Sequence, residues 1–333
     1  MRGEEYLAFV DEFVAAVQQR YPKCCIQWED FANLNAVPIL ARYRDKICTF
    51  NDDIQGTAGV ALAGIVAALR LTGQKLADQR FLFLGAGSAA TGIAELISLA
   101  MAREGADLAT ARRRNALFDI NGLVVTSRTD LAAFQKPFAQ DRAPVSTFVD
   151  AVEALRPTGI IGVSTVPKLF THEVIQAMAR INERPIIFPY SNPTSLSECT
   201  AEEAYRWSDG RAVFASGSPF PPVEIAGRRF VPGQGNNVYI FPAMGMAVFA
   251  TEATRVTEEM FIVAAQAVAE QVTEEDLAMG LIYPPQSHIL DASLHVAERI
   301  ATCIFDQGLA QVPRPTDVGL LIRERVYRPL YPE

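Results

Sequence analysis

We predict an α/β fold for this sequence, with a doubly wound, Rossmann-like parallel sheet and flanking helical segments at both ends. Three observations predict it. Between residues 80 and 190, short continuous apolar runs alternate with stretches of helical length. The first apolar run ends in a glycine-rich turn that opens a helix, and helical patterns dominate before and after this region. Buried parallel strands have continuous apolar sequences, and right-handed crossovers between them produce a doubly wound sheet.

Residues 1–55 predict a helical segment that precedes the sheet. Apolar side chains recur at helical spacing over residues 1–20, so this stretch is expected to form a one-faced helix. A second helix is expected at 35–43. Between these helices, the short apolar stretch 25–28 runs directly into a pair of acids.

The sheet domain is expected to span residues 56–310, and it opens with an apolar helix over 57–71. The strands that we expect lie at 81–84, 116–119, 159–163 and 185–189. The helices that we expect after the first strand lie at 91–102, 149–156, 172–181, 242–254, 257–271 and 287–307. Residues 311–333 are charged and contain several prolines, which predicts a C-terminal surface strap.

Charge and hydropathy exclude several classes of partner. The formal net charge is −8 at pH 7, which repels nucleic acid and anionic lipid, so we expect a small-molecule ligand. The apolar run 54–69 is too short for a confident membrane span, and polar residues and prolines interrupt the run 230–251. We therefore expect neither a nucleic-acid partner nor a membrane.

The five cysteines show no CxxC spacing, which favours reduced thiols and an intracellular compartment. The three histidines have no ligand spacing with a cysteine, so zinc has little support. Lys168 precedes an apolar pair and is interpreted as a surface residue rather than a catalytic base.

The turn after the first strand has the sequence Gly85-Ala86-Gly87-Ser88-Ala89-Ala90. A strand before it and a helix after it are the setting that the dinucleotide fingerprint G-x-G-x-x-G/A requires. Gly85 permits a tight turn, Gly87 lets a pyrophosphate approach the backbone, and Ala90 lets the helix pack closely. The helix start then offers N–H groups to the phosphates. The alternative is a purely structural glycine turn.

Asp119 ends the next strand and is expected to bind the ribose of a dinucleotide. It lies further along the chain than the usual ~20 residues, because an arginine-rich insertion at 112–114 intervenes. An acid at this position repels a 2′-phosphate, so we expect NAD as the cofactor, with NADP as the alternative.

Two acidic pairs, Glu29-Asp30 and Asp52-Asp53, follow short apolar stretches. Ligand sets made only of oxygen suit Mg²⁺ or Mn²⁺ rather than zinc. The alternative is that these acids are solvated, with Asp52-Asp53 capping the helix that begins near Thr57.

Five blocks of sequence resemble the malic enzyme family, in family order between about residues 5 and 310. The blocks are Ile26-Gln27-Trp28-Glu29-Asp30-Phe31-Ala32-Asn33, Phe50-Asn51-Asp52-Asp53-Ile54-Gln55-Gly56-Thr57-Ala58, Gly85-Ala86-Gly87, Tyr190-Ser191-Asn192-Pro193-Thr194 and Pro232-Gly233-Gln234-Gly235-Asn236-Asn237.

This resemblance implies a role for each matching residue. It implies metal ligation by Glu29, Asp30 and Asp53. It implies that Asn192 and Asn237 hold both the substrate and the nicotinamide ribose. It implies that the remaining contacts on the cofactor side come from Asn33, Thr57 and Val163. Residues 1–55 would then be the metal-binding remnant of the family's catalytic core.

The implied reaction is the oxidative decarboxylation of L-malate to pyruvate and CO₂, with reduction of NAD or NADP and dependence on Mg²⁺ or Mn²⁺. The family's lysine base, tyrosine acid and substrate-binding arginine belong to an N-terminal domain, and no motif of that domain precedes the acidic blocks here. We therefore expect this chain to bind dinucleotide but to turn over malate poorly or not at all.

Other interpretations remain open. Malolactic enzyme, which releases lactate, uses the same metal and cofactor and resembles the same blocks. A non-catalytic dinucleotide-binding module is a second alternative, because the base is missing. Family members that use NADP keep an acid at Asp119 and accommodate the phosphate with a nearby lysine, and the Gln135-Lys136 region is compatible with either dinucleotide. By analogy we expect a homo-dimer or tetramer in the cytoplasm, with the mitochondrial matrix as the alternative.

Overall fold

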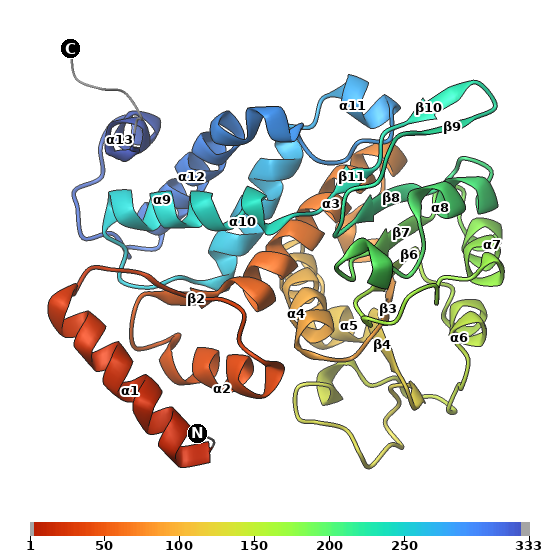
Figure 1. Ribbon diagram of the computed structural model, residues 1–333, viewed down its shortest axis with the longest axis horizontal. Coiled ribbons are helices and arrows are strands. Elements are labelled where there is room, and N and C mark those ends of the chain that lie inside the picture. The colour runs from red at the N-terminus through yellow and green to blue at the C-terminus, as the bar shows by residue number, and fades with distance from the viewer. Residues whose placement is uncertain (1–2, 328–333) are drawn as a thin grey trace.

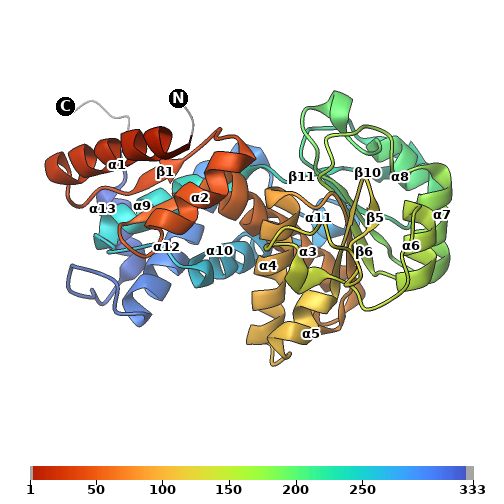
Figure 2. The ribbon, with the colours of Figure 1, turned by 90° about the horizontal axis from the view of Figure 1, so that it is seen from below.

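The computed structural model describes residues 3–327, and for Asn33 it describes the backbone alone. The helical elements of both chain ends gather on one side of the molecule, and the main sheet with its covering helices forms the other side (Figures 1 and 2). The first side matters for function because it brings the acidic blocks of the N-terminal segment against the edge of the sheet.

The N-terminal segment forms two helices around a small parallel strand pair. Its elements are α1 (Gly3–Arg20), β1 (Ile26–Trp28), α2 (Asn33–Tyr43) and β2 (Thr49–Asn51). Strand β1 pairs with β2 in register from Ile26 opposite Thr49. Val10, Val14 and Trp28 belong to a small core of their own beneath these elements. The helices expected at 1–20 and 35–43 therefore form, with boundaries that differ by a few residues.

A π-helical turn, η1 (Asp52–Gly56), joins β2 to the long apolar helix α3 (Thr57–Thr72). Asn51 caps this turn, because its side-chain oxygen accepts the N–H of Ile54 at 2.8 Å. The stretch 52–72 is long and apolar enough to cross a membrane, but 78% of its most apolar window is buried inside the protein. Helix α3 is thus the central core helix, as its alanine-rich sequence predicts.

The main sheet has seven strands in the order β11-β8-β7-β6-β3-β4-β5. The strands are β3 (Phe81–Leu84), β4 (Asn115–Asp119), β5 (Gly122–Leu123), β6 (Gly159–Gly162), β7 (Ile186–Pro189), β8 (Val213–Ser216) and β11 (Gly233–Gln234). All neighbours run parallel except β5, which returns antiparallel to β4. The chain moves from β3 outward to β4 and then to β6 on the other side of β3, which confirms the doubly wound prediction.

Helices cover both faces of this sheet, and the side chains of each strand alternate between the two faces. Phe81 and Phe83 join the larger core, whereas Leu82 and Leu84 join the smaller one. The larger core is covered mainly by α3, α4 (Ser88–Arg103), α9 (Phe241–Thr251), α10 (Glu258–Glu270) and α12 (Ile289–Asp306). The smaller core is covered by α6 (Phe148–Leu155), α7 (His172–Ile181) and α8 (Ala201–Trp207). Each fully buried large apolar side chain contributes about 1.5–3 kcal/mol.

Several short elements are absent from the sequence-based prediction. They are α5 (Leu108–Arg113), α8, α11 (Glu274–Ala278), α13 (Val318–Arg325), the strands β5, β8 and β11, and the antiparallel pair β9 (Val223–Ile225) and β10 (Arg228–Phe230). Helix α13 lies within the expected C-terminal strap and packs on α9 and α12. Pro329 and Pro332 of that strap lie outside the described residues.

Candidate metal and dinucleotide site

Three carboxylates from two separate stretches of chain converge at one end of the small strand pair. Glu29 and Asp30 follow β1, and Asp53 lies in the turn after β2. Because β1 and β2 are parallel, their carboxyl ends meet at the same edge. One oxygen atom from each carboxylate lies within 4.8 Å of the others. The N–H of Asp30 also donates to Asp53 Oδ2 at 2.9 Å, which holds the two stretches together.

The electrostatics of this acidic cluster fit a divalent cation. Glu29 and Asp30 are exposed, while Asp53 is half-buried, and burial raises the pKa of Asp53. In the described part of the chain, no lysine or arginine forms an ion pair with any of the three. Their like charges therefore repel one another unless a cation is bound. An all-oxygen set of this kind matches the preference of Mg²⁺ or Mn²⁺.

Asp52 lies next to the cluster and is deeply buried. It is 2% exposed, and its Oδ1 atom has no hydrogen-bond partner among the described residues. Burial raises its pKa to about 7, although a hydrogen bond from Asn237 opposes the shift. Since Asn51 caps the following turn, neither Asp52 nor Asp53 is needed as a helix cap. Asp53 is therefore left to the acidic cluster, whereas Asp52 already accepts a hydrogen bond from Asn237.

A cavity of about 330 Å³ opens beside these acids. Its lining includes Glu29, Asp53, Thr57, Asn192 and Asn237, which come from both the N-terminal segment and the sheet domain. Asn237 Nδ2 donates to Asp52 Oδ2 at 2.9 Å and to Thr57 Oγ1 at 3.2 Å. Asn192 Oδ1 accepts a hydrogen bond from Ser218 at 2.8 Å. The structure thus brings together six of the residues selected from sequence: Glu29, Asp30, Asp53, Thr57, Asn192 and Asn237.

The glycine-rich turn lies at the carboxyl end of β3. Gly85 has a φ of +123°, and a Cβ atom there would lie 2.7 Å from the carbonyl oxygen of Val163. Glycine is therefore required both by the backbone conformation and by the close approach of the β6 end. Helix α4 begins at Ser88 without a side-chain cap, and Ala90 is fully buried against the sheet. This is the geometry expected of a turn that receives a pyrophosphate at a helix start.

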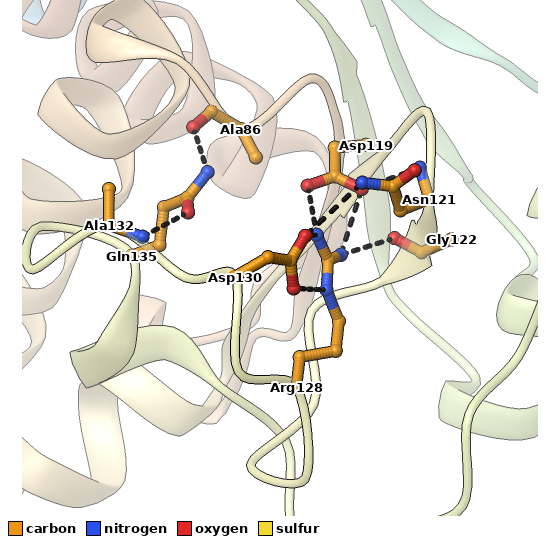
Figure 3. Close-up of polar contacts among 8 residues, drawn as sticks. All are labelled: Ala86, Asp119, Asn121, Gly122, Arg128, Asp130, Ala132 and Gln135. Atoms are coloured by element: carbon orange, nitrogen blue, oxygen red, sulfur yellow. Dashed lines mark hydrogen bonds and ion pairs between the residues drawn. The ribbon is translucent and has the colours of Figure 1, made fainter.

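Asp119 ends β4, but its carboxylate is already paired (Figure 3). Arg128 donates to both of its oxygens, at 2.8 and 2.9 Å. The same guanidinium also pairs with Asp130, and this arginine holds the pKa of Asp130 at about 2. Arg128 is only 13% exposed, so its positive charge lies in a confined position at the end of β4. Sequence reasoning selected Asp119 and missed Arg128, because only the loop conformation brings the two together.

Gln135 links this loop to the glycine-rich turn. Its Nε2 atom donates to Ala86 O at 2.9 Å, and its Oε1 atom accepts the N–H of Ala132 at 2.9 Å (Figure 3). The neighbouring Lys136 is exposed. The loop therefore places a free ammonium group next to a residue that touches the turn.

The side chains of two further residues from the sequence analysis, Asn33 and Lys168, are not assigned to the site. The side chain of Asn33 lies outside what the structure describes, although its backbone begins α2. Lys168 is exposed in the loop after β6 and has a left-handed backbone, with a φ of +61°. Nothing in its surroundings changes its interpretation as a surface residue.

A doubly wound sheet, a glycine-rich turn at the first strand and an acid at the end of the next define the class of Rossmann-like dinucleotide-binding proteins. Comparison with known proteins narrows this class. Residues 54–305 match the model described as "Malic enzyme, NAD binding domain". Residues 1–44 match the model described as "Malic enzyme, N-terminal domain". The chain belongs to the malic enzyme family and carries its NAD(P)-binding domain.

Individual relatives agree with this assignment. The chain is 52% identical to the NADP-dependent malic enzyme of Vitis vinifera over 99% of its own length and 56% of the relative. It is 50% identical to the chloroplastic NADP-dependent malic enzyme of Flaveria pringlei, over 99% of this chain and 52% of the relative. The solved structure of Entamoeba histolytica malic enzyme matches 95% of this chain and 61% of its own, with a TM-score of 0.77 at 26% identity.

The chain thus spans about half the length of the curated relatives it matches. The match of residues 1–44 shows that the expectation of no N-terminal-domain motif before the acidic blocks was wrong, because these residues are similar to part of that domain. The helical patterns of residues 1–20 and 35–43 did not indicate this domain, because amphipathic helices occur in many folds.

Proposed function

We propose that this chain carries the metal and dinucleotide sites of a malic enzyme that oxidises L-malate to pyruvate and CO₂ and reduces NADP. The observation that carries the proposal is the cluster of Glu29, Asp30 and Asp53, two of which, Glu29 and Asp53, line the same cavity as Asn192 and Asn237. This cavity adjoins the carboxyl edge of the sheet, where doubly wound proteins bind their ligands. The two curated relatives described above, 50% and 52% identical, are named NADP-dependent malic enzymes.

The proposed roles follow from the donor groups. Glu29, Asp30 and Asp53 would hold a divalent cation, which would supply positive charge for the binding of a 2-hydroxy acid and for the stabilisation of negative charge that develops on its oxygen. Asn237 is held by Asp52 and Thr57, so its amide is fixed at the cavity wall. The glycine-rich turn and the start of α4 bind the pyrophosphate. Asn192 and Asn237 are then placed to contact the substrate and the nicotinamide ribose.

Hydride transfer from C2 of malate needs a base for the hydroxyl proton, and the described cavity lining contains no lysine or histidine. Tyr190 lines the cavity, but its hydroxyl lies 2.6 Å from that of Tyr283 and burial raises its pKa. We therefore expect the purified 333-residue chain to bind dinucleotide and metal but to turn over malate poorly or not at all. A malate-dependent rise in NADPH absorbance with this chain would contradict that expectation.

The preference for NADP rests on the loop after β4. The sequence-based preference for NAD assumed that a free Asp119 carboxylate repels a 2′-phosphate. Arg128 pairs with that carboxylate and so weakens the repulsion, although the same guanidinium also pairs with Asp130. The exposed Lys136 supplies further positive charge on the same loop, and phosphate groups pair well with a lysine.

Isothermal titration calorimetry on the purified chain tests the proposal. We expect NADP to bind more tightly than NAD, and malate to bind only when Mn²⁺ is present. Malate binding that does not depend on Mn²⁺, or the absence of malate binding, would favour a non-catalytic dinucleotide-binding module. The malolactic alternative predicts that lactate is the product and that no reduced dinucleotide accumulates. A product assay on a protein as long as the relatives tests this.

Assembly and compartment are also proposals. Phe9, Phe13 and Phe249 are exposed by 58%, 48% and 63%, which supports a homo-dimer or tetramer that covers part of this surface. Light scattering measures the mass in solution directly. The expected cytoplasmic compartment stays a prediction, and the Flaveria pringlei relative is named as chloroplastic. Cell fractionation distinguishes these compartments.

A further inference from the structure

Glu198 is a fully buried carboxylate that none of the roles above uses. Its side chain is 0% exposed, and it belongs to the connection between β7 and α8, from which it contacts the loop that follows β6. A buried carboxylate is costly unless several hydrogen bonds or a cation compensate for the lost water. In the described part of the chain, Glu198 forms no ion pair with an arginine or lysine. Its oxygens are instead satisfied by hydrogen bonds.

These hydrogen bonds come from two serines on different loops. Ser164, after β6, donates its N–H to Glu198 Oε1 at 3.0 Å and its hydroxyl at 2.9 Å. Ser191, after β7, donates its hydroxyl to Oε1 at 2.5 Å and its N–H to Oε2 at 3.4 Å. One carboxylate thus accepts two donors from each loop. Bonds of this kind to a charged acceptor are stronger than bonds between neutral groups.

The backbone around Glu198 is shaped to admit it. A Cβ atom on Gly162, the last residue of β6, would lie 2.4 Å from the carboxyl carbon of Glu198. The same network reaches one residue further, because the N–H of Thr165 donates to Ser191 Oγ at 2.9 Å. Thr165 has a φ of +58°, a left-handed conformation that costs energy for a β-branched residue. The two loops therefore hold each other in one arrangement through Glu198.

Both loops adjoin residues of the proposed cofactor site. Val163 directly precedes Ser164, and its carbonyl oxygen faces the glycine-rich turn at Gly85. Asn192 directly follows Ser191 and is held from its other side by Ser218. A change in the position of either serine is transmitted through one peptide unit to a residue that lines or faces the site.

The strand order identifies which half of the dinucleotide these loops meet. In doubly wound folds the turn after β3 would hold the pyrophosphate, and the adenosine half would face Asp119 at the end of β4. The nicotinamide half then extends in the opposite direction, across the ends of β6 and β7. The loops that Glu198 joins are the loops at those two strand ends.

We infer that Glu198 is a positioning residue for the nicotinamide half of the dinucleotide, which it serves by fixing the loops after β6 and β7. This inference rests on the proposed function for the binding of the dinucleotide itself. Glu198 does not touch the cofactor. It acts through Ser164 and Ser191 on Val163 and Asn192.

The test compares two ligands on the purified 333-residue chain. NADP contains both halves of the dinucleotide, whereas adenosine 2′,5′-bisphosphate lacks the nicotinamide half. We expect Glu198→Leu to weaken NADP binding about tenfold or more and to change bisphosphate binding less than about twofold. Glu198→Gln keeps one acceptor oxygen for Ser164 and Ser191, so it is expected to restore most of the NADP affinity. Calorimetry measures both ligands.

Glu203→Ala is the matched control, because Glu203 is a partly exposed carboxylate five residues further on that caps α8 with Thr200. It is expected to leave the affinity for both ligands unchanged. Where Glu198→Leu fails to fold, Ser191→Ala carries the test, with an expected loss of several-fold for NADP alone. Equal losses for the two ligands, or no loss for NADP, would overturn the inference. A wild-type chain that binds neither ligand would overturn the proposed function together with it.

Discussion

At the scale of single residues, the site depends on charges whose partners lie far away in sequence. Glu29 and Asp30 meet Asp53 across a parallel strand pair, and Asp119 meets Arg128 across a loop. Within residues 3–327 the first group has no cationic partner, whereas Asp119 has one. This difference separates a site for a cation from a site whose acid is already paired. Both statements are open to tests by substitution.

Substitution of Asp53 by asparagine tests the acidic cluster. We expect Asp53→Asn to weaken Mn²⁺ binding at least about tenfold, because one of three charged ligands is lost. Without metal, the variant should unfold at the same temperature as wild type or slightly higher, since repulsion among the carboxylates falls. At about 100 times the dissociation constant, Mn²⁺ should stabilise the wild type by about 2.7 kcal/mol. Thermal unfolding with and without Mn²⁺ measures this, and an equal metal shift in both proteins would exclude the assigned ligand.

Substitution of Arg128 by alanine tests the choice of dinucleotide. Loss of the guanidinium leaves Asp119 unpaired, so we expect NADP to bind about tenfold more weakly while NAD changes little. Arg180→Ala is the control, because Arg180 pairs with Glu153 on the surface of α6 and α7. Calorimetric titration of each variant with both dinucleotides gives the ratio of the dissociation constants for NADP and NAD. An unchanged preference for NADP over NAD would show that other residues select the cofactor.

At the scale of elements, two short connections set the geometry of the site. The π-helical turn η1 carries Asp53 from β2 into α3, and the turn after β3 carries the chain into α4. Each connection is held by one special residue, Asn51 as the cap of η1 and Gly85 as the left-handed residue after β3. Changes in these residues alter an entire element rather than one contact.

A pair of glycine substitutions separates backbone strain from close approach. Gly85 and Gly105 both have positive φ values, +123° and +100°, but a Cβ atom on Gly105 would meet nothing within 4 Å. We expect Gly105→Ala to cost about 1 kcal/mol of stability through backbone strain alone. Gly85→Ala should cost roughly 2 kcal/mol more, because the carbonyl of Val163 must move, and it should abolish dinucleotide binding. Urea unfolding measures the loss of stability, and NADP titration measures the loss of binding. Equal losses of unfolding free energy in the two variants would contradict the close approach of the Val163 carbonyl to Gly85.

At the scale of the whole molecule, buried hydrogen bonds join parts of the chain that are distant in sequence. The hydroxyl of Tyr283 donates to Val60 O in α3 at 2.7 Å and lies 2.6 Å from the hydroxyl of Tyr190 after β7. Tyr283 is 1% exposed. It therefore connects the C-terminal helical region, the core helix and the sheet directly beneath the cavity.

Removal of this hydroxyl is expected to lower global stability. Tyr283→Phe removes the additional hydrogen bond that Val60 O accepts from the hydroxyl and leaves the buried Tyr190 hydroxyl without this partner, which should cost about 1–3 kcal/mol. Tyr327→Phe is the control, because Tyr327 is 85% exposed. Chemical denaturation followed by circular dichroism gives both free energies of unfolding. A cost below about 0.5 kcal/mol would show that water replaces the lost bonds.

Local sequence patterns determined many of the strands and the glycine-rich turn of this protein. The continuous apolar runs determined β3, β4, β6 and β7, and the fingerprint from Gly85 to Ala90 determined the turn between β3 and α4. These features are predictable because a buried strand and a glycine-dependent turn impose their requirements on neighbouring residues. The short strands β8 and β11 escaped prediction, since the pairing of so few residues depends on the strand beside them.

Only the tertiary structure decided how charges are paired. The sequence placed Glu29, Asp30 and Asp53 in two acidic pairs that were equally compatible with solvated caps. Folding brings them within 4.8 Å, and it closes Arg128 onto Asp119 and the serines of two loops onto Glu198. The physical reason is that the energy of a charge depends on its burial and on partners that only the folded chain brings near.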